Sequence, residues 1–121
     1  MDDGEVLDRR VIPGVLHTVR PIAVEEFPVF IRNSREYTLL HSARFGKLVQ
    51  MEVGALLVGR ICNPGRESRV KRGQEKGWFE YGGSTVVVLV QKDRLRLDDA
   101  FLTSDGEEIP VRLGQAIGER I

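Results

Sequence analysis

The feature that most limits what this chain can fold into is a series of short apolar segments separated by glycines. The segments cover residues 37–40, 48–53, 55–61 and 85–90, are rich in β-branched residues, and have the length of strands. The chain has 13 glycines, and in a strand-rich sequence glycines mark tight turns and close approaches of the backbone. The pattern therefore predicts a mostly β protein.

The helical signal is weak. Residues 23–32 have the composition of a short helix, but Pro28 limits that helix to a turn or two. A length of 121 residues is sufficient for one domain with one core. We therefore expect a single compact domain over residues 1–121, a barrel-like or sandwich fold of the barrel-sandwich type with at most short helices.

An eight-residue pattern occurs twice in the sequence. Residues 70–77 and 111–118 both read V-[KR]-x-G-Q-x-x-G. Two copies are too few for a solenoid, but the same pattern builds paired turns in small barrel-sandwich domains of the biotinyl and lipoyl carrier type. The repeat predicts two similar β-turns within one compact sheet, and it supports a fold rather than a function.

Composition narrows the possible classes of partner and compartment. Lysine and arginine balance aspartate and glutamate at 18 each, so bulk charge favours neither nucleic acid nor an anionic membrane as partner. Cys62 is the single cysteine, which excludes an internal disulfide and a cysteine-built metal site. Asp98, Asp99 and Asp105 lack the ligand spacing of a calcium loop, so we expect no metal. No apolar run is long enough to span a bilayer, and the acidic N-terminus is unlike a signal peptide.

The segment most relevant to chemistry is Gly82-Gly83-Ser84-Thr85, at the entrance to an apolar strand. Taken alone this tetrapeptide is most often a turn before a strand. A serine hydroxyl can nevertheless attack the carbonyl of a preceding glycine, which leaves that carbonyl unshielded, and convert the peptide bond to an ester. Elimination then gives dehydroalanine, which hydrolyses to a pyruvoyl group at the new N-terminus. Its ketone can form a Schiff base with a substrate amine and act as an electron sink.

The order of motifs resembles the phosphatidylserine decarboxylase family over about nine-tenths of the chain. The matching segments are Ile12-Pro13-Gly14, His17-Thr18-Val19-Arg20-Pro21-Ile22-Ala23, Phe45-Gly46-Lys47, Glu52-Val53-Gly54-Ala55, Val58-Gly59, the run from Lys71 to Gly77, Gly82-Gly83-Ser84-Thr85 and the closing Gly114 to Gly118. Arg20 stands where the family usually has asparagine.

The resemblance implies a lyase, made as a zymogen, that decarboxylates phosphatidylserine to phosphatidylethanolamine. By this likeness Gly83 supplies the attacked carbonyl, Ser84 becomes the pyruvoyl cofactor, and Thr85 with neighbouring backbone N–H groups stabilises the oxyanion. Basic residues Arg69, Lys71 and Lys76 are the expected phosphate ligands, although a solvated loop also explains this charge cluster. The implied partner is a phospholipid, and we expect a cytoplasmic protein in peripheral contact with the membrane.

Family members also carry an upstream region whose aspartate and histidine assist self-cleavage, and this chain is expected to begin just after it. We therefore expect either a complementing upstream chain or an oligomer formed through an exposed sheet edge. Neither His17 nor His41 is predicted to be the catalytic base. The alternative is an incomplete or degenerate family member that acts as a non-enzymatic binding module. A biotinyl-type carrier ranks last, because the chain lacks the modifiable lysine hairpin.

Overall fold

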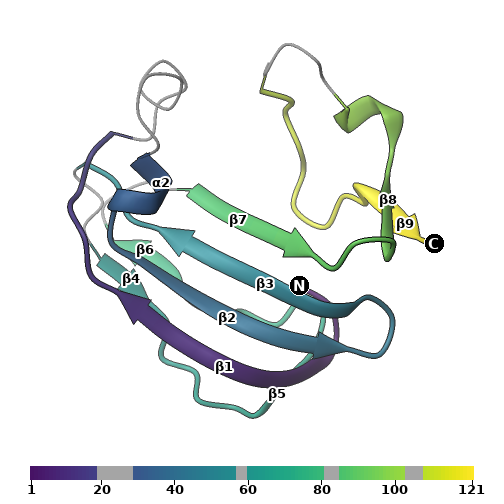
Figure 1. The fold of residues 1–121 in the computed structure, drawn as a ribbon, viewed down its shortest axis with the longest axis horizontal. Helices are drawn as coiled ribbons and strands as arrows, with labels where there is room; N and C mark the ends of the chain where they lie inside the picture. The colour runs from purple at the N-terminus through teal and green to yellow at the C-terminus, as the bar shows by residue number, and fades with distance from the viewer. Residues whose placement is uncertain (19–28, 57–59, 81–84, 103–107) are drawn as a thin grey trace.

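The computed structural model describes residues 1–18, 29–56, 60–80, 85–102 and 108–121, and within these ranges the main element is a curled antiparallel sheet (Figure 1). Its strands lie in the order β5-β1-β2-β3-β7. Their bounds are Gly4–Ile12 for β1, Arg35–Ser42 for β2, Gly46–Val53 for β3, Arg69–Val70 for β5 and Thr85–Val90 for β7. The mostly β prediction is confirmed.

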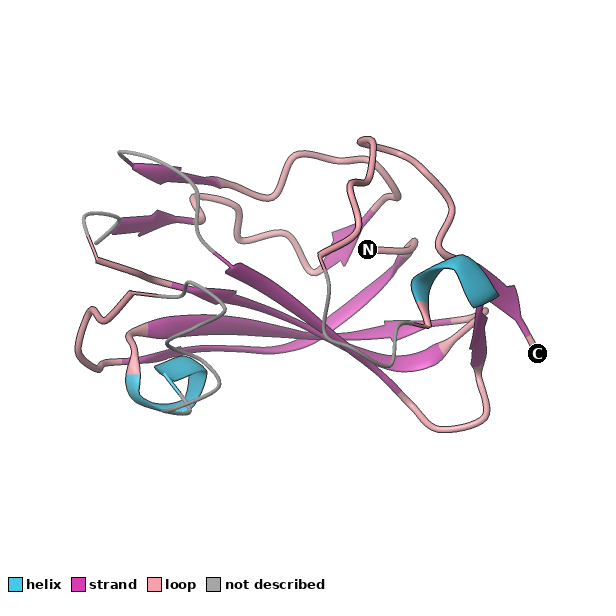
Figure 2. Cartoon of the chain, turned by 90° about the horizontal axis from the view of Figure 1, so that it is seen from above, coloured by secondary structure: helices cyan, strands magenta, loops and turns pink. Residues whose placement is uncertain are grey.

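Two short ribbons accompany the sheet. In one, β4 (Arg60–Cys62) pairs with β6 (Trp78–Glu80), and in the other β8 (Leu95–Leu97) pairs with β9 (Gly118–Arg120). The β4–β6 ribbon lies behind the left end of the sheet in Figure 1, and Figure 2 shows it as a separate layer, whereas β8–β9 lies at the opposite end. The helical elements described are α2 (Val29–Arg32) and the 3₁₀ turn η1 (Asp99–Phe101).

The strands predicted from alternating or continuous apolar runs can be compared with those in the structure. The predicted cores of β2, β3 and β7 are confirmed. The predicted strand over residues 55–61 is confirmed in part: Arg60 and Ile61 begin β4, whereas Leu56 lies in a turn and donates its N–H to the His17 carbonyl at 3.1 Å, and residues 57–59 lie outside the described residues. Strand β1 was missed. A register shift between Val6 and Asp8 interrupts the alternation of its side chains, so no period of two appears in its sequence.

The described part of the core is small and lies mainly on one face of the sheet. Directly opposed residues on antiparallel strands share a face, so Leu40, Leu48 and Val90 lie together. Leu40 and Leu48 are buried there, beside Thr38 and Gln50 on the same face. We call this side the inner face; residues 63–77 cover part of it.

The two copies of the repeat form the same turn. In the first, Gln74 donates its N–H to the Lys71 carbonyl at 3.1 Å, and its side-chain oxygen accepts the Lys71 N–H at 3.0 Å. Gln115 makes the equivalent pair with Arg112 at 2.9 Å and 2.9 Å. Gly73 and Gly114 have φ of +76° and +80°, the left-handed region that favours glycine. The turns are as predicted, but their placement in one sheet is wrong, since each leads into a separate ribbon.

A buried carboxylate ties the first turn to the sheet. Asp2 accepts hydrogen bonds from the Ser42 hydroxyl at 2.6 Å, from the Arg44 guanidinium, and from Arg72 Nη2 at 2.7 Å. Burial raises the pKa of this carboxyl, but the bonds from Ser42, Arg44 and Arg72 outweigh it and lower the pKa to about 2. Asp2 therefore joins the start of the chain, the β2–β3 hairpin and the turn at 71–74.

Candidate active site

Four strand ends form one row across the left end of the sheet. Ile12 lies opposite Arg35, Arg35 opposite Val53, and Val53 opposite Thr85. In Figure 1 the heads of β1 and β3 and the tails of β2 and β7 meet at this end. The segments that follow Ile12 and Val53 therefore leave the sheet at the end where β7 begins with Thr85. Both segments, and Thr85 itself, belong to motifs that the sequence singles out.

Asn33 fastens two of those segments together, and its side chain is completely buried. Its amide nitrogen donates to the carbonyls of His17 at 2.9 Å and Gly54 at 2.8 Å, and its amide oxygen accepts the His17 N–H at 3.1 Å. A side chain with all these groups satisfied by backbone fixes the spacing of the two segments. Sequence reasoning missed Asn33, because a lone polar residue next to a short helix carries no periodic signal.

The residues predicted to carry the chemistry lie at this edge or adjoin it in sequence. Thr85 is half-buried and is the first residue of β7, paired with the fully buried Val53. Gly83 and Ser84 lie outside the described residues. The last described residue before them is Glu80, at the end of β6. The Gly-Gly-Ser sequence is thus located between the end of the β4–β6 ribbon and the start of β7.

A second buried carboxylate, Glu52, lies one position before Val53 on the inner face. Its oxygens accept hydrogen bonds from Gln50 at 2.7 Å, Asn63 at 3.2 Å and Lys76 at 2.7 Å. The exposed fractions of the Glu52 and Lys76 side chains are 7% and 21%. A carboxylate so buried requires this compensation, because an unpaired charge away from water is strongly unfavourable. Nothing in the sequence near Glu52 indicates these partners.

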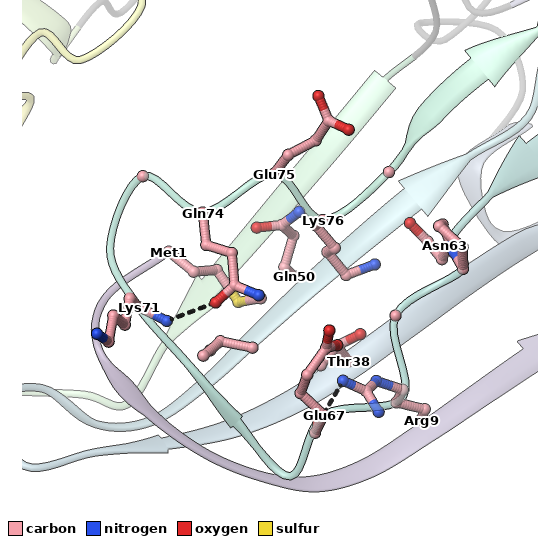
Figure 3. Close-up of a pocket in the computed structure, with 15 residues that line it drawn as sticks. Met1, Arg9, Thr38, Gln50, Asn63, Glu67, Lys71, Gln74, Glu75 and Lys76 are labelled. Atoms are coloured by element: carbon pink, nitrogen blue, oxygen red, sulfur yellow. Dashed lines mark hydrogen bonds between the residues drawn. The ribbon is translucent and has the colours of Figure 1, made fainter.

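The three predicted phosphate ligands are divided between two places. Lys71 and Lys76 line a pocket of about 380 Å³ between the inner face and residues 63–77, with Arg9, Thr38 and Gln50 on its floor (Figure 3). The buried Thr38 hydroxyl has no hydrogen-bond partner within the described residues.

Arg69 lines a different hollow with Glu5 and His41. It pairs with Glu5, which is seven positions along β1 from Ile12. That separation is roughly 20 Å or more at the rise of a strand. Lys76 is thus close to the row of strand ends through Glu52, whereas Arg69 is remote from it.

The two histidines also occupy different ends of the sheet. His17 is exposed and its backbone is held by Asn33, whereas His41 is an exposed residue near the far end of β2. Among the described residues, no group of three or more His, Cys, Asp or Glu side chains is arranged to hold a metal ion. Within the same part of the chain, no helix is sufficiently long and apolar to cross a membrane.

Comparison with known proteins identifies relatives. The family model described as phosphatidylserine decarboxylase matches residues 1–119. The chain is 44% identical to phosphatidylserine decarboxylase proenzyme 2 of Clostridium acetobutylicum over 121 residues, which covers 98% of the chain and 41% of that protein. It is 38% identical to the phosphatidylserine decarboxylase proenzymes of Clostridium botulinum (strain Langeland) and Ruminiclostridium cellulolyticum, covering 99% of the chain and 42% and 41% of those proteins. The chain thus spans about two-fifths of these relatives. No solved structure matches it.

Proposed function

Because the chain belongs to the phosphatidylserine decarboxylase family, we propose that it supplies the self-cleaving, pyruvoyl-forming part of a phosphatidylserine decarboxylase. In this proposal the chain is cut between Gly83 and Ser84, and Ser84 becomes the pyruvoyl group. The complete protein then converts phosphatidylserine to phosphatidylethanolamine with release of carbon dioxide.

The chemistry begins on the chain itself. The Ser84 hydroxyl adds to the Gly83 carbonyl, and its proton is transferred to the departing amide nitrogen as the peptide bond becomes an ester. Removal of the Ser84 α-proton expels the Gly83 carboxylate and leaves dehydroalanine, and water then replaces its amine as ammonia to give the ketone. Thr85 and nearby backbone N–H groups stabilise the negative charge on the attacked oxygen. Once formed, the pyruvoyl group supplies an electron sink for decarboxylation of an amine-bearing substrate.

The observation that carries the proposal is the row of strand ends at Ile12, Arg35, Val53 and Thr85. It brings the segments that follow Ile12 and Val53 to the start of β7, directly after Ser84 in the sequence. The buried Asn33 amide nitrogen then holds the neighbouring backbone by donating to the Gly54 carbonyl at 2.8 Å. A rigid frame of this kind is what a reaction within the backbone needs, because the attacking and attacked atoms must be held in near-contact.

For the substrate we propose that Lys76 and Lys71 bind the phosphate of the lipid head group. Both line the pocket that also contains the Thr38 hydroxyl, which has no partner among the described residues and can donate to a head-group oxygen. Lys76 is the better supported of the two, because Glu52 holds it near Thr85. Arg69 is the least supported ligand of the three, since it lies on another hollow.

We also propose peripheral contact with a membrane at the candidate active-site end. Exposed apolar side chains gather there: Val15, Leu16, Ile31 and Leu56. They are linked by backbone bonds, since Val15 pairs with Asn33 and Leu56 bonds to His17. Exposed apolar side chains grouped around a lipid-processing site favour contact with a lipid surface. Oligomer formation and a complementing upstream chain remain parts of the same proposal.

The test uses a chimera in which this chain replaces the matching part of the Clostridium acetobutylicum relative, called the completed protein below. We expect it to release carbon dioxide from phosphatidylserine in mixed micelles, and the Ser84→Ala variant to release none. Ser68→Ala, which alters an exposed serine before β5, is the matched control and retains activity. Decarboxylation by the Ser84→Ala variant would overturn the mechanism.

A further inference from the structure

Glu52 does more than neutralise one lysine, because two of its partners adjoin the two strands of the β4–β6 ribbon. Asn63 directly follows β4, and Lys76 lies two residues before β6. Their nitrogens reach the same Glu52 oxygen, Oε2, at 3.2 Å and 2.7 Å. Gln50, the neighbouring inner-face residue of β3, donates to the other oxygen at 2.7 Å. One buried carboxylate thus fastens the ribbon to the main sheet.

The ribbon is itself stiffened along its length. Cys62 pairs with Trp78, Ile61 with Phe79, and Arg60 with Glu80. At the far end Arg60 makes an ion pair with Glu80 at 3.3 Å. A paired ribbon fixed at one end has its other end fixed as well, so the attachment at Glu52 sets where Glu80 lies.

Glu52 also belongs to the ladder that positions β7. It lies directly opposite Val86, and the next pair in the register is Val53 with Thr85. Glu52 therefore holds β6, the strand before Gly83 and Ser84 in the sequence, and lies opposite β7, the strand after them. The distance between Glu80 and Thr85, which a four-residue connection must span, depends on this attachment.

The second copy of the repeat shows what the turn is like without the attachment. Lys76 corresponds to Ile117 in that copy, and Ile117 is exposed. The turn hydrogen bonds are the same in both copies, so Lys76 is not needed to form the turn. Lys76 is found only in the copy whose ribbon is attached to Glu52, which indicates that its role is the attachment.

From these contacts we infer that Glu52, acting through Lys76 and Asn63, is a positioning residue for self-cleavage between Gly83 and Ser84. It sets the approach of β6 to β7, the two strands that flank the bond to be cut in the sequence. This inference rests on the proposed function. Glu52 takes no part in the bond changes, and its effect is on the rate at which the completed protein cuts itself.

The test compares cleavage rate with thermal stability in the completed protein. The variants are Glu52→Gln, which keeps the size of the side chain, Lys76→Met, and the double variant Glu52→Met with Lys76→Met. Fragments are followed by intact mass after synthesis in a cell-free system. We expect each single variant to cleave at least tenfold more slowly than the wild type, measured well below its Tm.

The double variant separates positioning from stability. Replacing a buried ion pair by apolar residues of similar volume is often neutral for stability, so its Tm should return towards that of the wild type while cleavage stays at least tenfold slow. Glu119→Gln, which removes the exposed Arg96 pair of the other ribbon, is the control and cleaves at the wild-type rate.

Cleavage at the wild-type rate in either single variant, or in the double variant, would overturn the inference and leave the proposed function intact. Wild-type protein that stays uncut would overturn both.

Discussion

The two ribbons start from the same eight-residue pattern and end in different situations. Both have the glutamine turn and a glycine at positive φ. Both also have a glycine packed closely against the backbone of the partner strand. A Cβ at Gly77 would lie 2.1 Å from the Cys62 carbonyl oxygen, and a Cβ at Gly118 would lie 2.3 Å from the Arg96 carbonyl oxygen. They differ at four of the eight positions, and at two of these the first copy has Arg72 and Lys76 where the second has Leu113 and Ile117.

Those two differences are the residues that bind the buried carboxylates. Arg72 bonds to Asp2 and Lys76 to Glu52, whereas Leu113 and Ile117 are exposed to solvent. The comparison teaches that local sequence fixes the shape of the turn, while two charged side chains decide whether the turn is fastened to the sheet. Only the fastened copy leads into the strand that precedes Gly83.

Exchanging these residues gives the largest expected effect. The double variant Arg72→Leu with Lys76→Ile removes the cation that pairs with Glu52 and one of the two guanidinium groups that bind Asp2. Because buried carboxylates then lose their partners, the free energy of unfolding should fall by at least about 3 kcal/mol. The reciprocal variant Leu113→Arg with Ile117→Lys changes exposed positions and should cost less than about 0.5 kcal/mol. Urea unfolding measures both, and similar losses in the two copies would contradict the comparison.

Acid should loosen the first copy through Asp2. Its pKa is lowered from 3.8 to about 2 in the folded chain, so its contribution to stability is complete above about pH 4 and is lost as the pH falls towards 2. The shift corresponds to about 2 kcal/mol. The free energy of unfolding of the wild type should therefore fall between pH 5 and pH 2. In Asp2→Asn the fall over the same range should be smaller by about 2 kcal/mol. Equal pH profiles would refute the role assigned to the carboxylate.

Replacing the turn glycine by alanine should lower stability by the same amount in both copies. Gly73→Ala and Gly114→Ala each place an L-residue at positive φ with no neighbouring atom within 4 Å. Each should therefore lower stability by about 1 kcal/mol through backbone strain alone. Thermal unfolding of the two variants tests whether the turns are equivalent. A clear difference between their stabilities would show that contacts outside the repeat already affect the turn.

The smallest effect is expected from the exposed pair of the second ribbon. Arg96 and Glu119 form an ion pair whose side chains are 72% and 64% exposed. Glu119→Gln should change the free energy of unfolding by less than about 0.5 kcal/mol, with the difference disappearing in high salt. A loss comparable to that of Glu52→Gln would remove the contrast between the ribbons.

Local pattern was sufficient for much of the fold. The apolar β-branched runs predicted β2, β3 and β7, and the repeat predicted both turns, because these depend on neighbours in sequence. The sequence could not indicate β1, whose alternation is broken by the shift between Val6 and Asp8. It also predicted strand at Leu56, whose N–H instead bonds to the His17 carbonyl, a contact from a distant part of the chain.

The candidate site was only partly predictable for the same reason. The Gly82–Thr85 motif is contiguous and could be read directly, but the groups that frame it are distant in sequence. Asn33 reaches Gly54 across 21 positions, and Lys76 reaches Glu52 across 24. Such contacts depend on strand register and on which polar groups are buried, and neither is visible in the residues themselves.

The most direct test of the central claim is the intact mass of the wild-type completed protein, with and without a reductive amine trap for a ketone. The account predicts two fragments divided between Gly83 and Ser84, the second beginning with a pyruvoyl group that takes up the trap. A single uncut chain that takes up no trap would contradict it.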